Sequence, residues 1–264
     1  MSNRLANLSP KVSKDVSARI LTMDLECSAN LVYAFGLRDQ NIGLSQIVEH
    51  GKMISFAARW YGDEDVIYRS VHDDGEDDML ATLWQLLDDC DVLVTFNGVS
   101  FDVKVAQRAL LLAGYPPPTP WKDIDLLRIA RRRFRFTSNK LQNLCYELGL
   151  PLKVETGGFD LWKRCADGDP VAWKEMRTYN IQDVIVTEQL MDRMRPWLTG
   201  LHHGLWSDNA QTCTNCGGTD LVKIPGKTIK ANVTAYQAYR CNACGTVARG
   251  NIKMRNPIQT RAAQ

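Results

Sequence analysis

The sequence of 264 residues has no long apolar run, little net charge and no repeated or low-complexity segment. No apolar stretch approaches the roughly 18 residues that a membrane-spanning helix needs. The N-terminal segment also lacks the apolar core of a secretory signal. The formal charge is +2 at pH 7 and 45% of the residues are hydrophobic, values that are ordinary for a globular protein. These features predict a cytoplasmic protein with no membrane partner, and they leave its function open.

The charge is unevenly distributed along the chain. From Leu201 to the C-terminus there are eight Lys and Arg residues and two Asp and Glu residues, which is a charge of +6. Subtracting these from totals of 32 and 30 leaves 24 basic and 28 acidic residues, so residues 1–200 carry −4. If four cysteines of the basic segment bind zinc as thiolates, its charge falls to about +4. That charge is still suited to contact with nucleic acid.

Two domains of unequal size are expected from a chain of this length. Residues 1–17 are polar and aperiodic, and they predict a flexible arm. The larger domain is expected over 18–196, followed by a linker over 197–212. A small cysteine-containing domain is expected over 213–250, and a basic tail over 251–264.

The larger domain begins with three β-rich stretches, at 18–26, 31–37 and 52–60, separated by turn-forming Asn and Gly residues. They predict three antiparallel strands. A short apolar run at 91–96 predicts a buried strand, and several helical patterns follow, the last over Pro170–Met194. Together these patterns predict an α/β domain with a mixed sheet flanked by helices.

Asp24 and Glu26 stand two residues apart on the first predicted strand. Side chains at this spacing point to the same face of a strand, so the two carboxylates are expected side by side. Such a pair fits either a divalent-metal site or a solvated edge strand. Asn97 and Asp102 lie around the turn that follows the buried strand, where functional groups are common. They also fit a simple turn and a helix N-terminus.

Tyr179 and Asp183 lie one helical turn apart on the last long helix, so both side chains fall on one face. Alone, this spacing is typical of an ordinary surface pair. The order of the three motifs, DxE on a first strand, Nx3FD after a later strand and YxxxD on a late helix, is more specific. It closely resembles the DEDD (DnaQ-like) superfamily of exonucleases, in its DEDDy branch, over roughly residues 18–196. Phage-type replication and repair exonucleases that carry zinc ribbons are similar.

The resemblance implies an RNase H-like fold and a 3′→5′ exonuclease that acts on single-stranded DNA or DNA 3′ ends. It implies that two Mg²⁺ or Mn²⁺ ions are held by Asp24, Glu26, Asp102 and Asp183, with Asp24 between them. Tyr179 would orient the attacking water, and Asn97 and Phe101 would contact the substrate. A viral origin would place the protein in the host cytoplasm. RNA as substrate is an open alternative, because contacts to the 2′-OH cannot be recognised in the sequence.

The segment RRRFRF interleaves basic and aromatic residues, which suits phosphate contact and base stacking. Arg132, Arg133 and Arg135 are therefore candidate substrate-binding residues. The segment equally fits the end of an amphipathic helix whose arginine stems cover apolar surface.

Eight cysteines divide into four isolated residues and two tight pairs. Cys213 with Cys216, and Cys241 with Cys244, each form a CxxCG turn, and a predicted strand hairpin separates the turns. This arrangement resembles a zinc ribbon with one structural Zn²⁺ held by four thiolates. The ribbon fits nucleic-acid contact and docking of a replication or repair protein equally well. A non-catalytic nucleic-acid adaptor is the alternative to an enzyme, although it would need neither the four carboxylates nor the tyrosine.

Overall fold

The computed structural model describes residues 18–36, 38–152, 157–207, 209, 211–231 and 234–254. The chain divides into two compact units, one spanning Arg19–Met194 and the other formed mainly from Arg195 onward. The predicted arm over 1–17 and residues 255–264 of the predicted basic tail lie outside the described residues.

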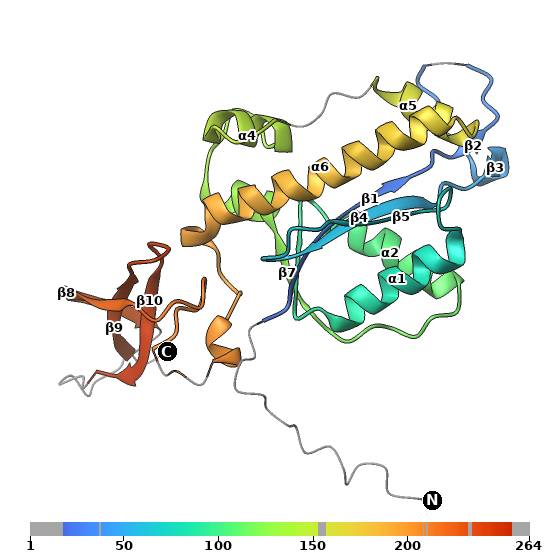
Figure 1. Cartoon of the computed structure of the whole chain (residues 1–264). Helices are drawn as coiled ribbons and strands as arrows, with labels where there is room; N and C mark the ends of the chain where they lie inside the picture. The colour runs from blue at the N-terminus through green and yellow to red at the C-terminus, as the bar shows by residue number, and fades with distance from the viewer. Residues whose placement is uncertain are drawn as a thin grey trace, which may run out of the picture. The chain divides into compact units, whose positions relative to one another are not determined.

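The first unit is built on a five-stranded sheet with the order β5-β4-β1-β6-β7 (Figure 1). Strand β1 pairs antiparallel with β4, and β4 pairs antiparallel with β5. On the other side, β1 pairs parallel with β6, and β6 pairs parallel with β7. The predicted mixed sheet, antiparallel first and parallel later, is therefore confirmed. The strands are β1 (Ile20–Cys27), β4 (Met53–Trp60), β5 (Ile67–Ser70), β6 (Val92–Thr95) and β7 (Lys122–Asp125).

The prediction that residues 31–37 form a strand of this sheet is wrong. Among its described residues, 31–36, the segment contains only β2 (Leu31–Val32), which pairs with β3 (Ile47–Glu49) in a separate two-stranded sheet. The aromatic side chains of this segment do not enter the core, since Tyr33 is 77% exposed and Phe35 is fully exposed. The third antiparallel strand is β5, whose short and polar sequence gave no clear signal.

Helices cover both faces of the sheet (Figure 1). The long helix α6 packs on β1 and β4, and α1 and α2 contact β4 from the other side. Helix α6 spans the predicted residues, and its end coincides with the start of an Arg-Pro-Trp turn. No helix among the described residues combines the length and apolar character that a membrane span requires. The helices are α1 (Glu76–Asp89), α2 (Asp102–Leu112), α3 (Leu126–Arg133), α4 (Leu141–Leu148), α5 (Phe159–Ala166) and α6 (Pro170–Met194).

The alternation of side chains along β1 decides what each face of the sheet contains. Leu21, Met23 and Leu25 are buried in the cluster that includes α1 and α2. The side chains between them point to the opposite face, which α6 covers. Asp24 and Glu26 therefore lie under α6.

The second unit contains a three-stranded antiparallel sheet with the order β10-β9-β8. Its strands are β8 (Leu221–Ala231), β9 (Thr234–Cys241) and β10 (Val247–Lys253). Strand β10 ends at Lys253, three residues beyond Gly250, where the cysteine-containing domain was predicted to end. Two short 3-10 helices, Arg195–Trp197 and His203–Trp206, precede the sheet.

The turn after β6 leaves no room for a side chain at Gly98. A Cβ atom there would overlap the side chain of Thr95, which is buried. The backbone of Gly98 also accepts hydrogen bonds from Phe101 N and Val103 N, at 3.1 Å and 2.9 Å, so the turn cannot easily move away.

We predict that Gly98→Ala lowers the free energy of unfolding by about 1–3 kcal/mol, because the added methyl group overpacks a rigid turn. Gly157→Ala is the matched control, since a Cβ atom at Gly157 meets no atom within 4 Å. Urea unfolding of both variants provides the measurement. Equal stability of the two variants would contradict the steric account.

Candidate metal centres

Three carboxylates converge between β1 and α6. Oxygen atoms of Asp24, Glu26 and Asp183 all lie within 4.8 Å of one another. Asp24 and Glu26 come from alternate positions of β1, and Asp183 comes from α6, which packs on β1. The two sequence motifs, DxE and YxxxD, thus meet at one point.

Asp102 lies beside this cluster at the start of α2. Its Oδ1 atom accepts a hydrogen bond of 3.2 Å from Leu25 N, between the two acidic residues of β1. The backbone of Leu25 lies beyond the last pairing of β1 with β6, at Thr22, so the side chain of Asp102 takes the place of a strand partner. Burial raises the pKa of the Asp102 carboxyl to about 6, and the carboxylates of Asp125 and Asp183 also raise it.

Asn180 holds Asp24 in place. This asparagine is fully buried, and its Nδ2 donates to Asp24 Oδ2 at 2.7 Å and to the Asp24 carbonyl at 3.2 Å. Its Oδ1 accepts from Ser55 Oγ of β4 at 3.3 Å. Asn180 is not among the site residues predicted from the sequence, although an asparagine inside a long helix and next to Tyr179 is a signal that could have identified it.

Tyr179 lies one turn before Asp183 on α6 and is partly buried. Its ring packs edge-on against Trp162 of α5, with ring centroids 5.9 Å apart and an interplanar angle of 79°. Such an edge-to-face contact fixes the plane of the phenol ring. The structure therefore gives Tyr179 a defined orientation on the helix that carries Asp183.

A cleft of about 590 Å³ adjoins the acidic cluster. Two acidic residues of the cluster, Asp24 and Asp183, line the cleft. Two cationic side chains also line it, Arg131 at the end of α3 and Lys140 before α4. The cleft thus places positive charge near the carboxylates, as a phosphate-containing ligand would require. The lining residues are Asp24, Phe96, Asn97, Leu127, Arg131, Ser138, Asn139, Lys140, Leu141 and Asp183.

The predicted substrate-binding residues are distributed between this cleft and the outer surface. Asn97 lines the cleft, whereas Phe101 is 47% exposed and is not among the lining residues. Arg132, Arg133 and Arg135 are also exposed, and Arg131 is the arginine of this segment that reaches the cleft. Arg131 and its neighbours on α3 project in different directions, so only some arginines of the segment can face the cleft. This difference was not predicted from the sequence.

Asp125 is a second site residue that was not predicted from the sequence. It is buried at the end of β7, and its Oδ1 accepts from Arg128 N at 3.2 Å, as a helix N-cap, and from Asn97 N at 3.1 Å. Asn97 has a left-handed backbone, with φ of 69°. Asp125 therefore fixes the turn that presents Asn97 to the cleft. An Asp directly before an apolar helical pattern was the available signal.

The acidic cluster suits a hard divalent cation. Its ligand atoms are carboxylate oxygens, which Mg²⁺ and Mn²⁺ prefer, and they crowd together at the edge of a buried core. Burial raises the pKa of the neighbouring Asp102, because a buried carboxylate loses its solvation by water. A bound cation would offset this cost.

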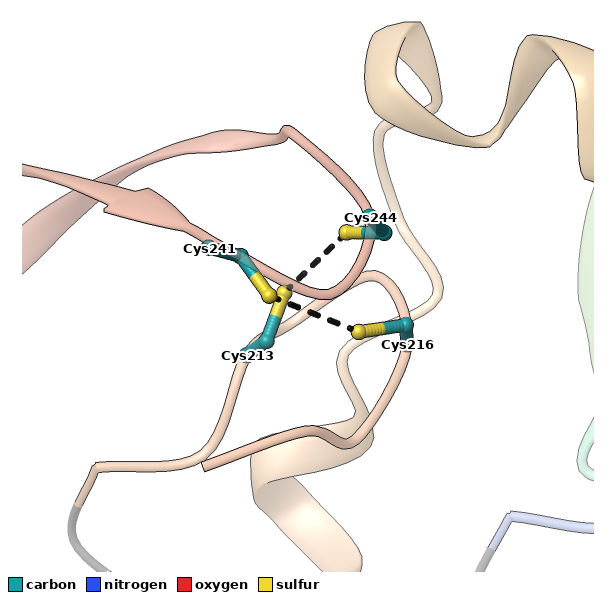
Figure 2. A group of neighbouring side chains, drawn as sticks. All are labelled: Cys213, Cys216, Cys241 and Cys244. Atoms are coloured by element: carbon teal, nitrogen blue, oxygen red, sulfur yellow. Dashed lines mark hydrogen bonds between the residues drawn. The ribbon is translucent and has the colours of Figure 1, made fainter. Parts of the chain in front are cut away.

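Four cysteines form a second cluster in the C-terminal unit (Figure 2). Cys213 and Cys244 have their Sγ atoms 3.7 Å apart, as do Cys216 and Cys241. These separations exclude disulfides, whose sulfurs lie about 2.0 Å apart. Zinc with Zn–S bonds of about 2.3 Å places tetrahedral sulfurs about 3.8 Å apart, so the cluster fits a structural zinc ion.

The two cysteine turns have matching backbone geometry. Gly217 and Gly245 both have left-handed backbones, with φ of 75° and 78°. Each donates its N–H to the first cysteine of its turn, Gly217 to Cys213 O at 3.0 Å and Gly245 to Cys241 O at 2.8 Å. Glycine adopts this conformation at no steric cost, which explains its place after each CxxC pair.

Comparisons with known proteins agree with the fold of the first unit. A family model of the RNase H superfamily matches residues 42–195. A family B DNA polymerase from the hyperthermophilic archaeon Pyrobaculum calidifontis has a similar fold, with a TM-score of 0.52 and 15% sequence identity. The similar region covers 68% of this chain and 25% of the polymerase chain. A search of curated proteins found no match.

We predict that Asp102→Asn stabilises the metal-free protein at high pH more than at low pH. The folded state raises the pKa of Asp102 from 3.8 to about 6, so wild type loses stability as the pH rises through that range. The variant has no such loss, and its advantage should grow by up to about 3 kcal/mol. Urea unfolding in EDTA at pH 4 and pH 8 measures this. If the difference in unfolding free energy between variant and wild type is the same at both pH values, the raised pKa of Asp102 is contradicted.

We predict that Cys216→Ser abolishes stoichiometric zinc binding, because a hydroxyl is a poor substitute for a thiolate ligand. Cys27→Ser is the control, since Cys27 is partly exposed but lies outside the cluster. Zinc content per chain after dialysis is measured by metal analysis. Full zinc content in Cys216→Ser would refute the four-cysteine site.

Proposed function

The chain belongs to the RNase H superfamily, and on that basis we propose that it is a metal-dependent 3′→5′ exonuclease that hydrolyses single-stranded DNA to nucleoside monophosphates. The convergence of Asp24, Glu26 and Asp183, with Asp102 beside them, carries the proposal. The same four carboxylates form the motifs that resemble the DEDDy exonucleases. The adjoining cleft, with Arg131 and Lys140, supplies a place for the phosphates of a strand.

The four carboxylates would hold two Mg²⁺ or Mn²⁺ ions. When bound, such ions neutralise charge on the scissile phosphate, make a water nucleophilic near neutral pH and stabilise the leaving 3′-oxygen. Asn180 keeps the Asp24 carboxylate in a fixed orientation through its 2.7 Å hydrogen bond. This preorganisation matters because small displacements of catalytic groups are costly.

Tyr179 would orient the attacking water through its phenolic hydroxyl. The edge-on contact with Trp162 restricts the ring, so the hydroxyl has a stable position from which to act. Asn97 and Arg131 would contact the strand within the cleft. Four exposed side chains would contact the strand outside the cleft: those of Phe101, Arg132, Arg133 and Arg135.

The structural zinc ion would stabilise the C-terminal ribbon. A role in replication or repair follows from the resemblance to phage-type exonucleases, and the ribbon is the part available for a partner in such a role. The same catalytic site would serve an exoribonuclease, so both DNA and RNA strands are tested as substrates.

We predict that the protein shortens 5′-labelled single-stranded DNA from its 3′ end in Mg²⁺ or Mn²⁺, and that EDTA stops the reaction. Asp183→Asn should lower the rate at least about a hundredfold, because it removes a metal-binding charge. Asp167→Asn is the matched control, since Asp167 is an exposed acid at the end of α5.

An RNA strand of the same sequence runs in parallel. Faster shortening of RNA would identify an exoribonuclease. Absence of cleavage of both strands by folded, zinc-loaded protein would refute the enzyme and favour a nucleic-acid adaptor.

A further inference from the structure

The three-stranded sheet of the C-terminal unit carries positive charge alone. Over β8, β9 and β10 there are six Lys and Arg residues and no Asp or Glu residue. The zinc site contributes about −2 when its four thiolates bind the ion, and it lies at one end of the sheet, at Cys241. All charged side chains of the strands themselves are therefore positive. The basic residues are Lys223, Lys227, Lys230, Arg240, Arg249 and Lys253.

The strand register assigns three of these residues to one face. Arg240 and Tyr236 lie four residues apart on β9, and directly paired residues of antiparallel strands point to the same side. Arg249 pairs with Ala238, and Lys253 pairs with Tyr236. Arg240, Arg249, Lys253 and Tyr236 therefore share one face, which we call the arginine face.

The arginine face combines exposed cationic groups with an aromatic ring. The side chains of Arg240, Arg249 and Lys253 are exposed, and the guanidinium carbon of Arg249 lies 4.3 Å from the centroid of the Tyr236 ring. This cation–π contact holds the guanidinium in place. Arg240 donates one hydrogen bond, at 3.0 Å, to the carbonyl of Gly245 in the second cysteine turn. Its remaining N–H donors are available for a ligand, because a guanidinium has five.

Exposed apolar side chains accompany these cations. Val222 and Val247 both pair with Arg240 and are 48% and 47% exposed. A face that offers guanidinium groups, an aromatic ring and adjacent apolar surface matches a single-stranded polynucleotide, whose phosphates alternate with flat bases. An acidic protein surface would satisfy the charges but would not use the ordered stack of Arg249 on Tyr236.

We propose that the arginine face is a nucleic-acid-binding site, separate from the carboxylate cluster. Arg240, Arg249 and Lys253 bind phosphates of a single strand, and the stack of Arg249 on Tyr236 supports a base. This site goes beyond the proposed nuclease activity and does not depend on it, because binding needs no hydrolysis. The zinc ion serves the site indirectly, by fixing the turn to which Arg240 is tethered.

The test measures binding by the full chain with zinc bound, in the Asp183→Asn background and without added Mg²⁺, so that the strand stays intact. Fluorescence anisotropy of a labelled single strand of 20 nucleotides gives Kd at several NaCl concentrations. Arg240→Gln/Arg249→Gln/Lys253→Gln should raise Kd at least about tenfold at 0.1 M salt. The slope of log K against log salt should fall by about 2, because each lost phosphate contact contributes about 0.7.

Lys104→Gln/Lys122→Gln/Lys174→Gln is the matched control, since it removes the same charge from exposed positions of the first unit. It should leave Kd within about twofold. Tyr236→Leu should weaken binding about fivefold or more with an unchanged salt slope, because stacking involves no counterion release. Zinc content of one ion per chain in each variant verifies that the ribbon is folded.

Wild-type Kd and salt slope in the arginine-face variant would overturn the proposal and favour a protein partner for this face. An equal loss in the lysine control would also overturn it, because binding would then depend on overall charge. Both outcomes are distinct from a failure of the nuclease proposal, which is judged by cleavage alone.

Discussion

The crowding of four carboxylates, of which Asp102 and Asp183 are buried, is the constraint on which the first unit depends. Oxygen atoms of Asp24, Glu26 and Asp183 approach within 4.8 Å, and Asp102 is almost fully buried beside them with a pKa raised to about 6. Burying this much negative charge opposes folding unless a cation compensates it. The surrounding structure holds the groups together nonetheless, which is expected where a fold sacrifices stability for a functional site.

Several elements of the fold share the task of holding these groups. The period of two along β1 places Asp24 and Glu26 under α6. The alternate residues of β1, such as Met23 and Leu25, anchor the strand in the core. Asn180 fixes the Asp24 carboxylate from α6. On the parallel side of the sheet, Asp125 fixes the turn of Asn97. The site thus rests on strands of the central sheet and on α6, so regular elements position its side chains.

The parts of this arrangement that depend on local spacing could be predicted from the sequence, and those that depend on tertiary packing could not. Strand β1 and helix α6 follow from periods of two and 3.6, and the cysteine turns follow from CxxCG. Local patterns single out Asn180 and Asp125, but they do not reveal the partners of these residues, which lie 156 and 28 positions away. The apolar segment at 31–37 looked like a sheet strand because periodicity does not tell whether anything packs against it. Likewise, the sequence RRRFRF does not show which arginine reaches the cleft.

The central claim is that the carboxylate cluster is a divalent-metal centre within a nuclease site. Anomalous diffraction from crystals grown with Mn²⁺ and a nucleoside 5′-monophosphate tests it most directly. The account predicts manganese peaks at the carboxylates and a separate zinc peak among the four cysteines. A well-ordered site with no manganese beside Asp24 and Asp183 would contradict the account.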